Sequence, residues 1–179
     1  MEYAPESMVR LLKNYQDLVT RVDTHIQRVE TRYKQHIACQ KGCDDCCRPL
    51  SLFPVEALAL SLEFNALPPA KQAAAEKNLA DQDRCPLLKD HECLLYGARP
   101  VICRTHGFPI FMAGKDNRAT VDFCPKNFTG MTGFPREMLL DLDQLNTTLA
   151  AVNRLFLQAF DTPFPHRIPV SKALFLVSG

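Results

Sequence analysis

Apolar side chains recur at gaps of three and four positions near the start of the chain, and mostly polar residues fill the positions between them. The series is Leu11, Tyr15, Leu18, Val22, Ile26, Val29, Tyr33 and Ile37. This spacing follows one face of an α-helix and predicts a long amphipathic helix. About 35 helical residues would span roughly 50 Å, more than a small core covers. We expect the C-terminal half of this helix to lie across the domain, and we leave open that its exposed end pairs with a second subunit.

Three further helices are predicted beyond this one. Residues 54–64 are apolar on nearly all sides and begin with Pro54, which suits a first helical position, so they predict a buried helix. Residues 70–82 are rich in Ala, Lys and Glu, typical of an exposed helix. From Pro135 to Phe160, large apolar residues again step by three and four, which predicts a second amphipathic helix.

Between these helices the pattern changes to short runs bounded by turn residues. Cys85-Pro-Leu-Leu and Cys93-Leu-Leu-Tyr flank Lys89-Asp-His-Glu, which predicts a small hairpin with one thiol on each arm. Residues 108–112 and 120–123 are candidate strands around a turn that begins at Gly114. The predicted class is mainly α (α+β), a compact helical domain with an irregular cysteine-rich middle. We divide it into the long N-terminal helix, residues 1–38, and a cysteine-cluster metal-binding domain, residues 39–179, within one globular unit.

Composition argues against two classes of function, nucleic-acid binding and membrane insertion. The chain of 179 residues is 46% hydrophobic and 23% charged, as in globular proteins. Its net charge is +1 and no basic stripe is present, which argues against nucleic acid as a partner. No apolar run reaches membrane-spanning length, and the N-terminus lacks a signal-peptide pattern. We expect a cytoplasmic protein without a membrane partner.

The chain contains eight cysteines, and these point to a specific chemistry. They are Cys39, Cys43, Cys46, Cys47, Cys85, Cys93, Cys103 and Cys124. The first four lie within nine residues, around a turn in which Gly42 supplies backbone freedom. In a reducing compartment, so many clustered thiols are typical of metal ligands rather than of a disulfide framework. All eight are therefore candidate metal ligands.

Two kinds of centre fit these thiols. Structural zinc takes four ligands tetrahedrally, so eight cysteines could make two sites. Neighbouring side chains diverge, so Cys46 and Cys47 are not expected to share one tetrahedron. A four-iron cluster is commonly held by three closely spaced cysteines and one distant cysteine, and Cys39, Cys43 and Cys46 supply the close set. We lean towards an iron–sulfur cluster of this 4Fe–4S type and keep zinc as the alternative.

Thiolates around a metal leave negative charge that requires cationic or N–H neighbours. Arg48, Arg99 and Arg104 each lie within a few positions of a cysteine and are candidates for contacting the bound cofactor. Lys41 is expected to be a surface residue. The pair Asp44 and Asp45 would repel thiolates, so both are expected to face solvent or to bond backbone N–H groups.

Sequence alone assigns no catalytic residue. Cys103 and His106 could form a nucleophile and its base, but a separation of three residues demonstrates no contact. The spacing of Cys39, Cys43 and Cys46 also coincides with the signature of radical S-adenosylmethionine enzymes. Those enzymes place the motif after the first strand of a large β/α barrel, whereas here it follows a long helix in a short chain.

Four stretches carry the cysteines, and their order and content are specific. They are Cys39-x3-Cys43-x2-Cys46-Cys47, Cys85-Pro-Leu-Leu, Cys93-Leu-Leu-Tyr96-x2-Arg99-Pro100-x2-Cys103-Arg104 and Cys124-Pro125. Together they resemble the YkgJ-type cysteine-cluster family, a group described as a zinc- or iron-chelating domain with a CxxCxxCC motif. The gap between Cys39 and Cys43 is three residues, where the family motif has two. The resemblance implies metal chelation by these cysteines.

Relatives of the flagellin lysine N-methylase type carry a similar cysteine set, and they are thought to combine an iron–sulfur cluster with methyl transfer. This chain has no Gly-rich nucleotide loop after a strand, so that enzyme is kept as an alternative only. We interpret the chain as a metal-binding protein that holds an iron–sulfur cluster or zinc. An adaptor that dimerises through residues 1–36 is a third hypothesis.

Overall fold

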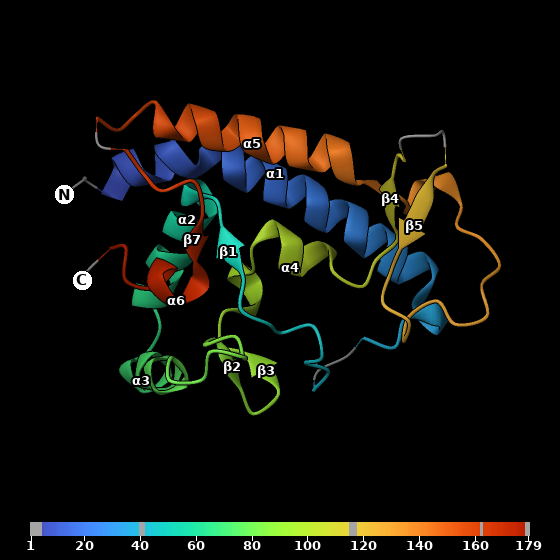
Figure 1. Cartoon of the computed structure of the whole chain (residues 1–179), viewed down its shortest axis with the longest axis horizontal. Helices are drawn as coiled ribbons and strands as arrows, with labels where there is room; N and C mark the ends of the chain where they lie inside the picture. The colour runs from blue at the N-terminus through green and yellow to red at the C-terminus, as the bar shows by residue number, and fades with distance from the viewer. Residues whose placement is uncertain (1–4, 40–41, 115–117, 162, 178–179) are drawn as a thin grey trace.

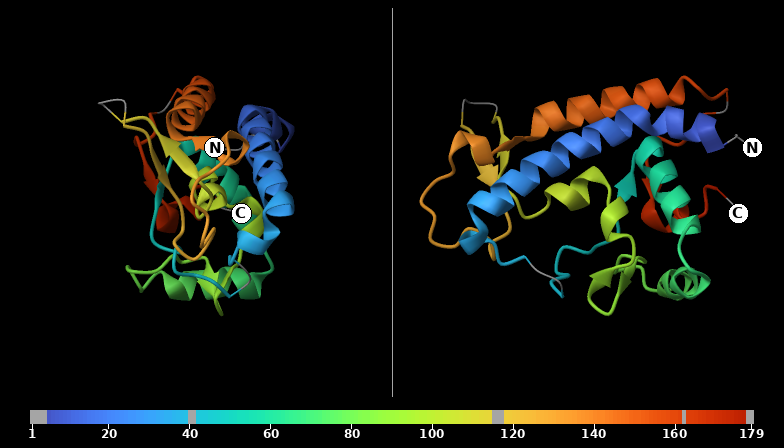
Figure 2. Two further views of the ribbon diagram at one scale, coloured as in Figure 1. Left: turned by 90° about the vertical axis from the view of Figure 1, so that its right-hand side faces the viewer. Right: turned by 180° about the vertical axis from the view of Figure 1, so that it is seen from behind.

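Two long helices form one side of the molecule. The computed structural model describes residues 5–39, 42–114, 118–161 and 163–177, with side chains described from residue 10 onward. Helix α1 (Pro5–Arg32) and helix α5 (Leu142–Leu157) lie side by side (Figures 1 and 2). Helix α4 (Val101–Thr105) packs on α1, and the segment 42–50 lies on the side of the molecule away from α5 (Figures 1 and 2). Helix α5 and the turn that carries the first four cysteines therefore lie on opposite sides of the molecule.

The apolar face predicted for α1 is confirmed. Its buried side chains are Leu12, Tyr15, Leu18, Val22, Ile26 and Val29. The predicted continuation of this helix to residue 38 is wrong, because α1 ends at Arg32 and a 3-10 turn, η1 (Lys34–His36), follows. Beyond α1 the backbone pairs with a distant segment instead, since the carbonyl of His36 accepts the N–H of Phe128. A contact remote in sequence therefore sets the end of the helix.

Helix α2 (Pro54–Asn65) is the buried helix predicted from its apolar composition, and it packs on α1 and α5. Glu56, in its first turn, is only 3% exposed. Its carboxylate accepts the N–H of Phe53 at the start of α2 and the N–H of Val101 at the start of α4. Burial raises the pKa of Glu56, and the two backbone N–H donors oppose that effect. This side chain ties two helix N-termini together and so fixes where α4 begins.

The remaining elements are short. Helix α3 (Pro69–Asn78) ends before the predicted residue 82, and helix α6 (Val170–Ala173) packs on α2. Strand β1 (Ser51–Leu52) pairs antiparallel with β7 (Ile168–Pro169). The predicted hairpin is confirmed as β2 (Leu88–Lys89) and β3 (Glu92–Cys93).

A three-stranded sheet stands at the end of the molecule where α1 finishes. Strand β4 (Ile110–Met112) pairs antiparallel with β5 (Thr120–Asp122) and parallel with β6 (Leu140–Asp141). Residues 115–117 of the predicted turn lie outside the described residues, and so does Lys41. Helices and small sheets together confirm the predicted α+β class.

The start of α5 differs from the prediction. The helix begins at Leu142 rather than at Pro135, after a 3-10 turn, η3 (Arg136–Met138), and strand β6. The N–H of Leu140 donates to the carbonyl of Pro109 at 2.9 Å, which draws this segment onto the edge of β4. Asp141 then caps the helix by accepting the N–H of Gln144 at 2.9 Å. Among the described residues, no helix combines the length and the apolar character that crossing a lipid bilayer requires.

Candidate metal centre

All eight cysteines are free thiols, and they fall into two groups according to which thiols act on one another. The first is called the outer group. Its members are Cys39, Cys43, Cys46 and Cys124. Desolvation raises the pKa of Cys39, and the neighbouring thiols Cys43, Cys124 and Cys46 raise it further. Desolvation also raises the pKa of Cys46, with Cys43 and Cys124 adding to it. These four thiols therefore surround one region.

The second is called the inner group. Its members are Cys47, Cys85, Cys93 and Cys103. Burial raises the pKa of Cys103 to about 12, and the thiols of Cys85, Cys93 and Cys47 contribute. The pKa of Cys47 is likewise raised to about 12, by burial first and then by Cys46, Cys85 and Cys93. The N–H of Cys85 also donates to the carbonyl of Cys47 at 3.4 Å. Thiols with such pKa values are protonated at neutral pH unless a cation replaces the proton.

Cys46 and Cys47, adjacent in sequence, join the two groups, because their thiols hydrogen-bond to each other while Cys46 also acts on Cys43 and Cys124 and Cys47 on Cys85 and Cys93. The expected divergence of these two side chains is therefore not observed. Within each group the thiols are neighbours but are not gathered around one point. No three His, Cys, Asp or Glu side chains converge at the separations of a metal site anywhere in the described part of the chain. Coordination by either group therefore requires the sulfur atoms to move closer together.

The donor chemistry of each group fits zinc or an iron–sulfur core, both of which take four thiolates. The two nearby aspartates are engaged elsewhere. Asp44 pairs with Arg84 at 3.2 Å and with His91 at 3.1 Å, and Asp45 pairs with Lys126. Asp45 is exposed, as expected from the sequence, whereas Asp44 is held in ion pairs at the surface. Neither carboxylate competes for the thiol regions.

Asn127 lies beside the outer group, although the sequence patterns did not point to it. Its side chain is 0% exposed. The amide oxygen accepts the N–H groups of Ala38 at 2.9 Å and Cys39 at 3.0 Å, and the amide nitrogen donates to the carbonyl of Gly107 at 2.9 Å. The same side chain hydrogen-bonds the Cys39 thiol, which lowers the pKa of Cys39 against the effect of burial. Asn127 thus fixes the backbone that presents Cys39.

Gly107 lacks a side chain, which lets Asn127, Cys124 and Cys39 pack against its backbone. Its φ is +93°, in the left-handed region that favours glycine. A Cβ atom at this position would lie 3.1 Å from Nδ2 of Asn127, 3.5 Å from Cβ of Cys124 and 3.6 Å from Sγ of Cys39. Cys39 and Cys124 therefore meet at one backbone position, although they are far apart in sequence.

The comparison with protein families addresses this same segment. The model of the CxxCxxCC family, described as a putative zinc- or iron-chelating domain, matches residues 38–125. We refer to residues 38–125, the segment that this model matches, as the CxxCxxCC domain. No curated protein and no solved structure gave a significant match to the chain. The CxxCxxCC domain contains all eight cysteines, which agrees with the resemblance seen in the sequence.

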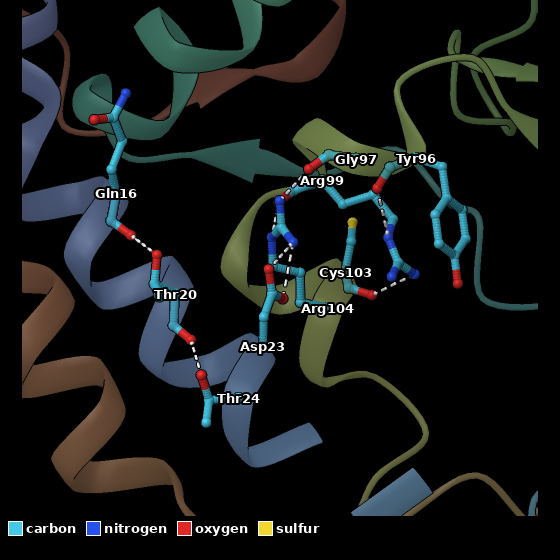
Figure 3. A network of polar contacts seen from close by, with 9 residues as sticks. All are labelled: Gln16, Thr20, Asp23, Thr24, Tyr96, Gly97, Arg99, Cys103 and Arg104. Carbon is cyan, nitrogen blue, oxygen red and sulfur yellow. Dashed lines mark hydrogen bonds and ion pairs between the residues drawn. The ribbon is translucent and has the colours of Figure 1, made fainter. Parts of the chain in front are cut away.

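Arg99 and Arg104, both in the CxxCxxCC domain, hold its α4 region in different ways (Figure 3). Arg99 stacks on the ring of Tyr96 at 3.7 Å and donates to the carbonyl of Cys103 at 3.3 Å. Its positive charge lowers the pKa of Cys93 and Cys103 against the larger effect of burial. Arg99 therefore lies where it can offset thiolate charge in the inner group.

Arg104 points away from the thiols towards α1. Its guanidinium donates to both carboxylate oxygens of Asp23, at 2.8 and 2.7 Å, and to the carbonyls of Arg99, at 2.6 Å, and Gly97 (Figure 3). Arg48, the third arginine singled out in the sequence, is exposed and lowers the pKa of Asp45. Two residues outside the CxxCxxCC domain thus bond to it: Asp23 through Arg104, and Asn127 through the backbone of Cys39 and Gly107.

Replacement of Asn127 by alanine is expected to destabilise the protein by about 2 kcal/mol, because two partly buried N–H donors and one buried carbonyl lose their partner. The free energy of unfolding in urea measures this effect. Asn146→Ala is the matched control, since Asn146 is exposed on α5 and should change stability by less than about 0.5 kcal/mol. Equal effects of the two substitutions would contradict the anchoring role of Asn127.

Proposed function

We propose that this chain is a non-catalytic metal-binding protein that holds one metal centre in each cysteine group. The observation that carries the proposal is that cysteines from segments remote in sequence lie together in two places, Cys39 with Cys124 at Gly107 and Cys47 with Cys85 at a backbone hydrogen bond. Four thiolates complete the coordination of a structural zinc ion or of a four-iron cluster. The family description of a zinc- or iron-chelating domain supports the same function.

A complete set of four protein ligands argues against catalysis at the metal. A catalytic metal keeps one position open for water or substrate, usually beside a pocket. Two grooves of about 560 and 710 Å³ lie along α1, and their linings include Arg28, Glu137 and Leu140 but contain no cysteine. These grooves are therefore not pockets beside either thiol group. We favour metal binding over the alternative of an iron–sulfur- or zinc-dependent enzyme of the lysine N-methylase type.

Charge explains the neighbours of the proposed centres. Four thiolates around Zn²⁺, or around a four-iron core of charge +2, leave a net charge of about −2. Arg99 lies beside Cys93 and Cys103, where its charge favours the thiolate forms. Lys126 occupies the corresponding place in the outer group, because Cys43 and Cys124 raise the pKa of Lys126 after the larger effect of Asp45. Each group therefore has one cationic side chain that suits a negatively charged centre.

Purification without oxygen, followed by elemental analysis and a visible spectrum, tests the proposal. We expect two centres per chain, which appear as two zinc ions in a colourless protein or as two iron–sulfur clusters in a brown one. Cys124→Ser in the outer group and Cys103→Ser in the inner group should each remove one centre and leave the other. Binding of no metal by the purified or reconstituted protein, or loss of both centres in both variants, would refute two separate sites.

A further inference from the structure

The two cysteine groups differ in their access to solvent. In the outer group, Cys39 and Cys46 are exposed, and the other two members are partly buried. All four members of the inner group are partly buried. Cys85 and Cys93 also pack against a buried apolar cluster that includes Leu87 and Leu95. Ligand exchange at a sulfur atom depends on access to it, so this difference bears on how a bound metal leaves.

The inner group is also held more firmly by its surroundings. Cys93 lies in strand β3 of the hairpin, and Cys103 lies in α4. The start of α4 is fixed by the buried Glu56, and its last turn by Arg104, whose side chain is 9% exposed. Opening the inner group would therefore disturb a hairpin, a helix and a buried ion pair together.

The outer group combines two anchored thiols with two on an exposed turn. Cys39 and Cys124 meet at Gly107 and are supported by the buried Asn127. Cys43 and Cys46 lie on the turn over residues 42–47, whose last residue, Cys47, belongs to the inner group and is held to Cys85 by a backbone hydrogen bond of 3.4 Å. Beside Cys43 and Cys46, Asp45 pairs with Lys126, and these two side chains are 67% and 54% exposed. An exposed ion pair contributes little to stability, so residues 43–46 can open without loss of the anchored half and without release of Cys47.

We propose that the outer group is an exchange site, which passes its metal ion to a competing ligand in solution, while the inner group retains a resident ion. This inference rests on the proposed function. Cys46 would be replaced first, because it is exposed and lies on the turn, whereas Cys39, which is also exposed, is anchored by Asn127: a donor atom of the incoming ligand would bind the ion, and the displaced sulfur would take a proton from solvent. Cys43 follows in the same way, and Cys39 and Cys124 release the ion last. No electron is transferred in any of these steps.

Cadmium provides the probe, because its thiolate complexes absorb in the ultraviolet. The full-length protein is loaded with Cd²⁺ and mixed with excess EDTA, and the loss of thiolate absorption is followed in time. We expect two phases of equal amplitude, a fast one from the outer group and a slow one from the inner group. Their rates should differ by about tenfold or more, because solvent reaches the sulfur atoms of the outer group more easily. Alkylation with N-ethylmaleimide after the fast phase, read by mass spectrometry, should modify Cys39, Cys43, Cys46 and Cys124 and spare the inner group.

A second comparison uses variants and does not depend on the alkylation pattern. Cys46→Ser is expected to remove the fast phase and leave the slow one at full amplitude. Lys126→Ala, which changes no thiol but removes the ion pair of the turn, is expected to quicken the fast phase only. A single phase, or alkylation of the inner group first, would overturn the exchange site while leaving two metal centres in place. Failure of the thiols to bind Cd²⁺ at all would instead overturn the proposed function.

Discussion

Removal of bound metal is expected to unfold the cysteine-bearing segments 42–50 and 84–104 while α1, α2 and α5 remain packed. Coordination by four thiolates contributes roughly 10–16 kcal/mol to the folding of small structural zinc sites. The segment 42–50 is otherwise held by few backbone bonds, such as Cys47 N–H to the carbonyl of Asp44 at 2.8 Å. The three helices instead share an apolar core that includes Val22, Val55 and Phe156 and does not depend on the thiols. Hydrogen exchange read by mass spectrometry, with and without a strong chelator, measures the two regions separately.

The expected pattern is a loss of exchange protection in 84–104 and around the outer group, with protection of α1 and α5 nearly unchanged. Restoring zinc should restore protection, which separates metal loss from irreversible damage. A control with the chelator already saturated by zinc excludes an effect of the chelator on the chain itself. Full protection of 84–104 after complete metal removal would show that the CxxCxxCC domain folds without its thiols being coordinated.

The helices could be predicted from sequence wherever local pattern decides the structure. A repeat of three and four residues reports which face of a helix is buried, and the buried set on α1 follows it. The ends of the helices depend on distant partners instead. The chain leaves the path of α1 after Arg32 and bonds to Phe128 through His36, and α5 begins only after Leu140 has bonded to Pro109. No pattern within either helix contains that information.

The candidate site was predictable in part for a similar reason. Eight cysteines at these spacings are visible in the sequence, but the divergence expected for the side chains of Cys46 and Cys47 is not observed, because their thiols hydrogen-bond to each other. The partition into an outer and an inner group requires knowing which segments fold together. No pattern in the sequence singles out Asn127. The available signal was the position of Asn127 three residues after Cys124, since side chains near a metal ligand often form the hydrogen bonds that orient it.

Loss of Arg104 is the second large effect expected. Arg104→Met should lower the free energy of unfolding by about 3 kcal/mol, because the substitution leaves Asp23 and the carbonyls of Arg99 and Gly97 without their donor. We choose the low end of the range for a broken buried pair, since Asp23 is 37% exposed and solvent compensates part of the loss. Urea unfolding of the metal-loaded protein measures this change.

A matched pair of substitutions on α1 tests whether the ion pair itself matters. Asp23→Asn should destabilise the protein. Asp17→Asn should change stability by less than about 0.5 kcal/mol, because the ion pair of Asp17 with Lys13 is exposed to solvent. Arg104→Lys keeps the charge but cannot reach Asp23 and two carbonyls together, so it should recover only part of the loss. If Arg104 couples α1 to the inner group, Arg104→Met should also quicken release of the inner metal. Release at the wild-type rate from a destabilised variant would show that Arg104 stabilises the fold without supporting the thiols.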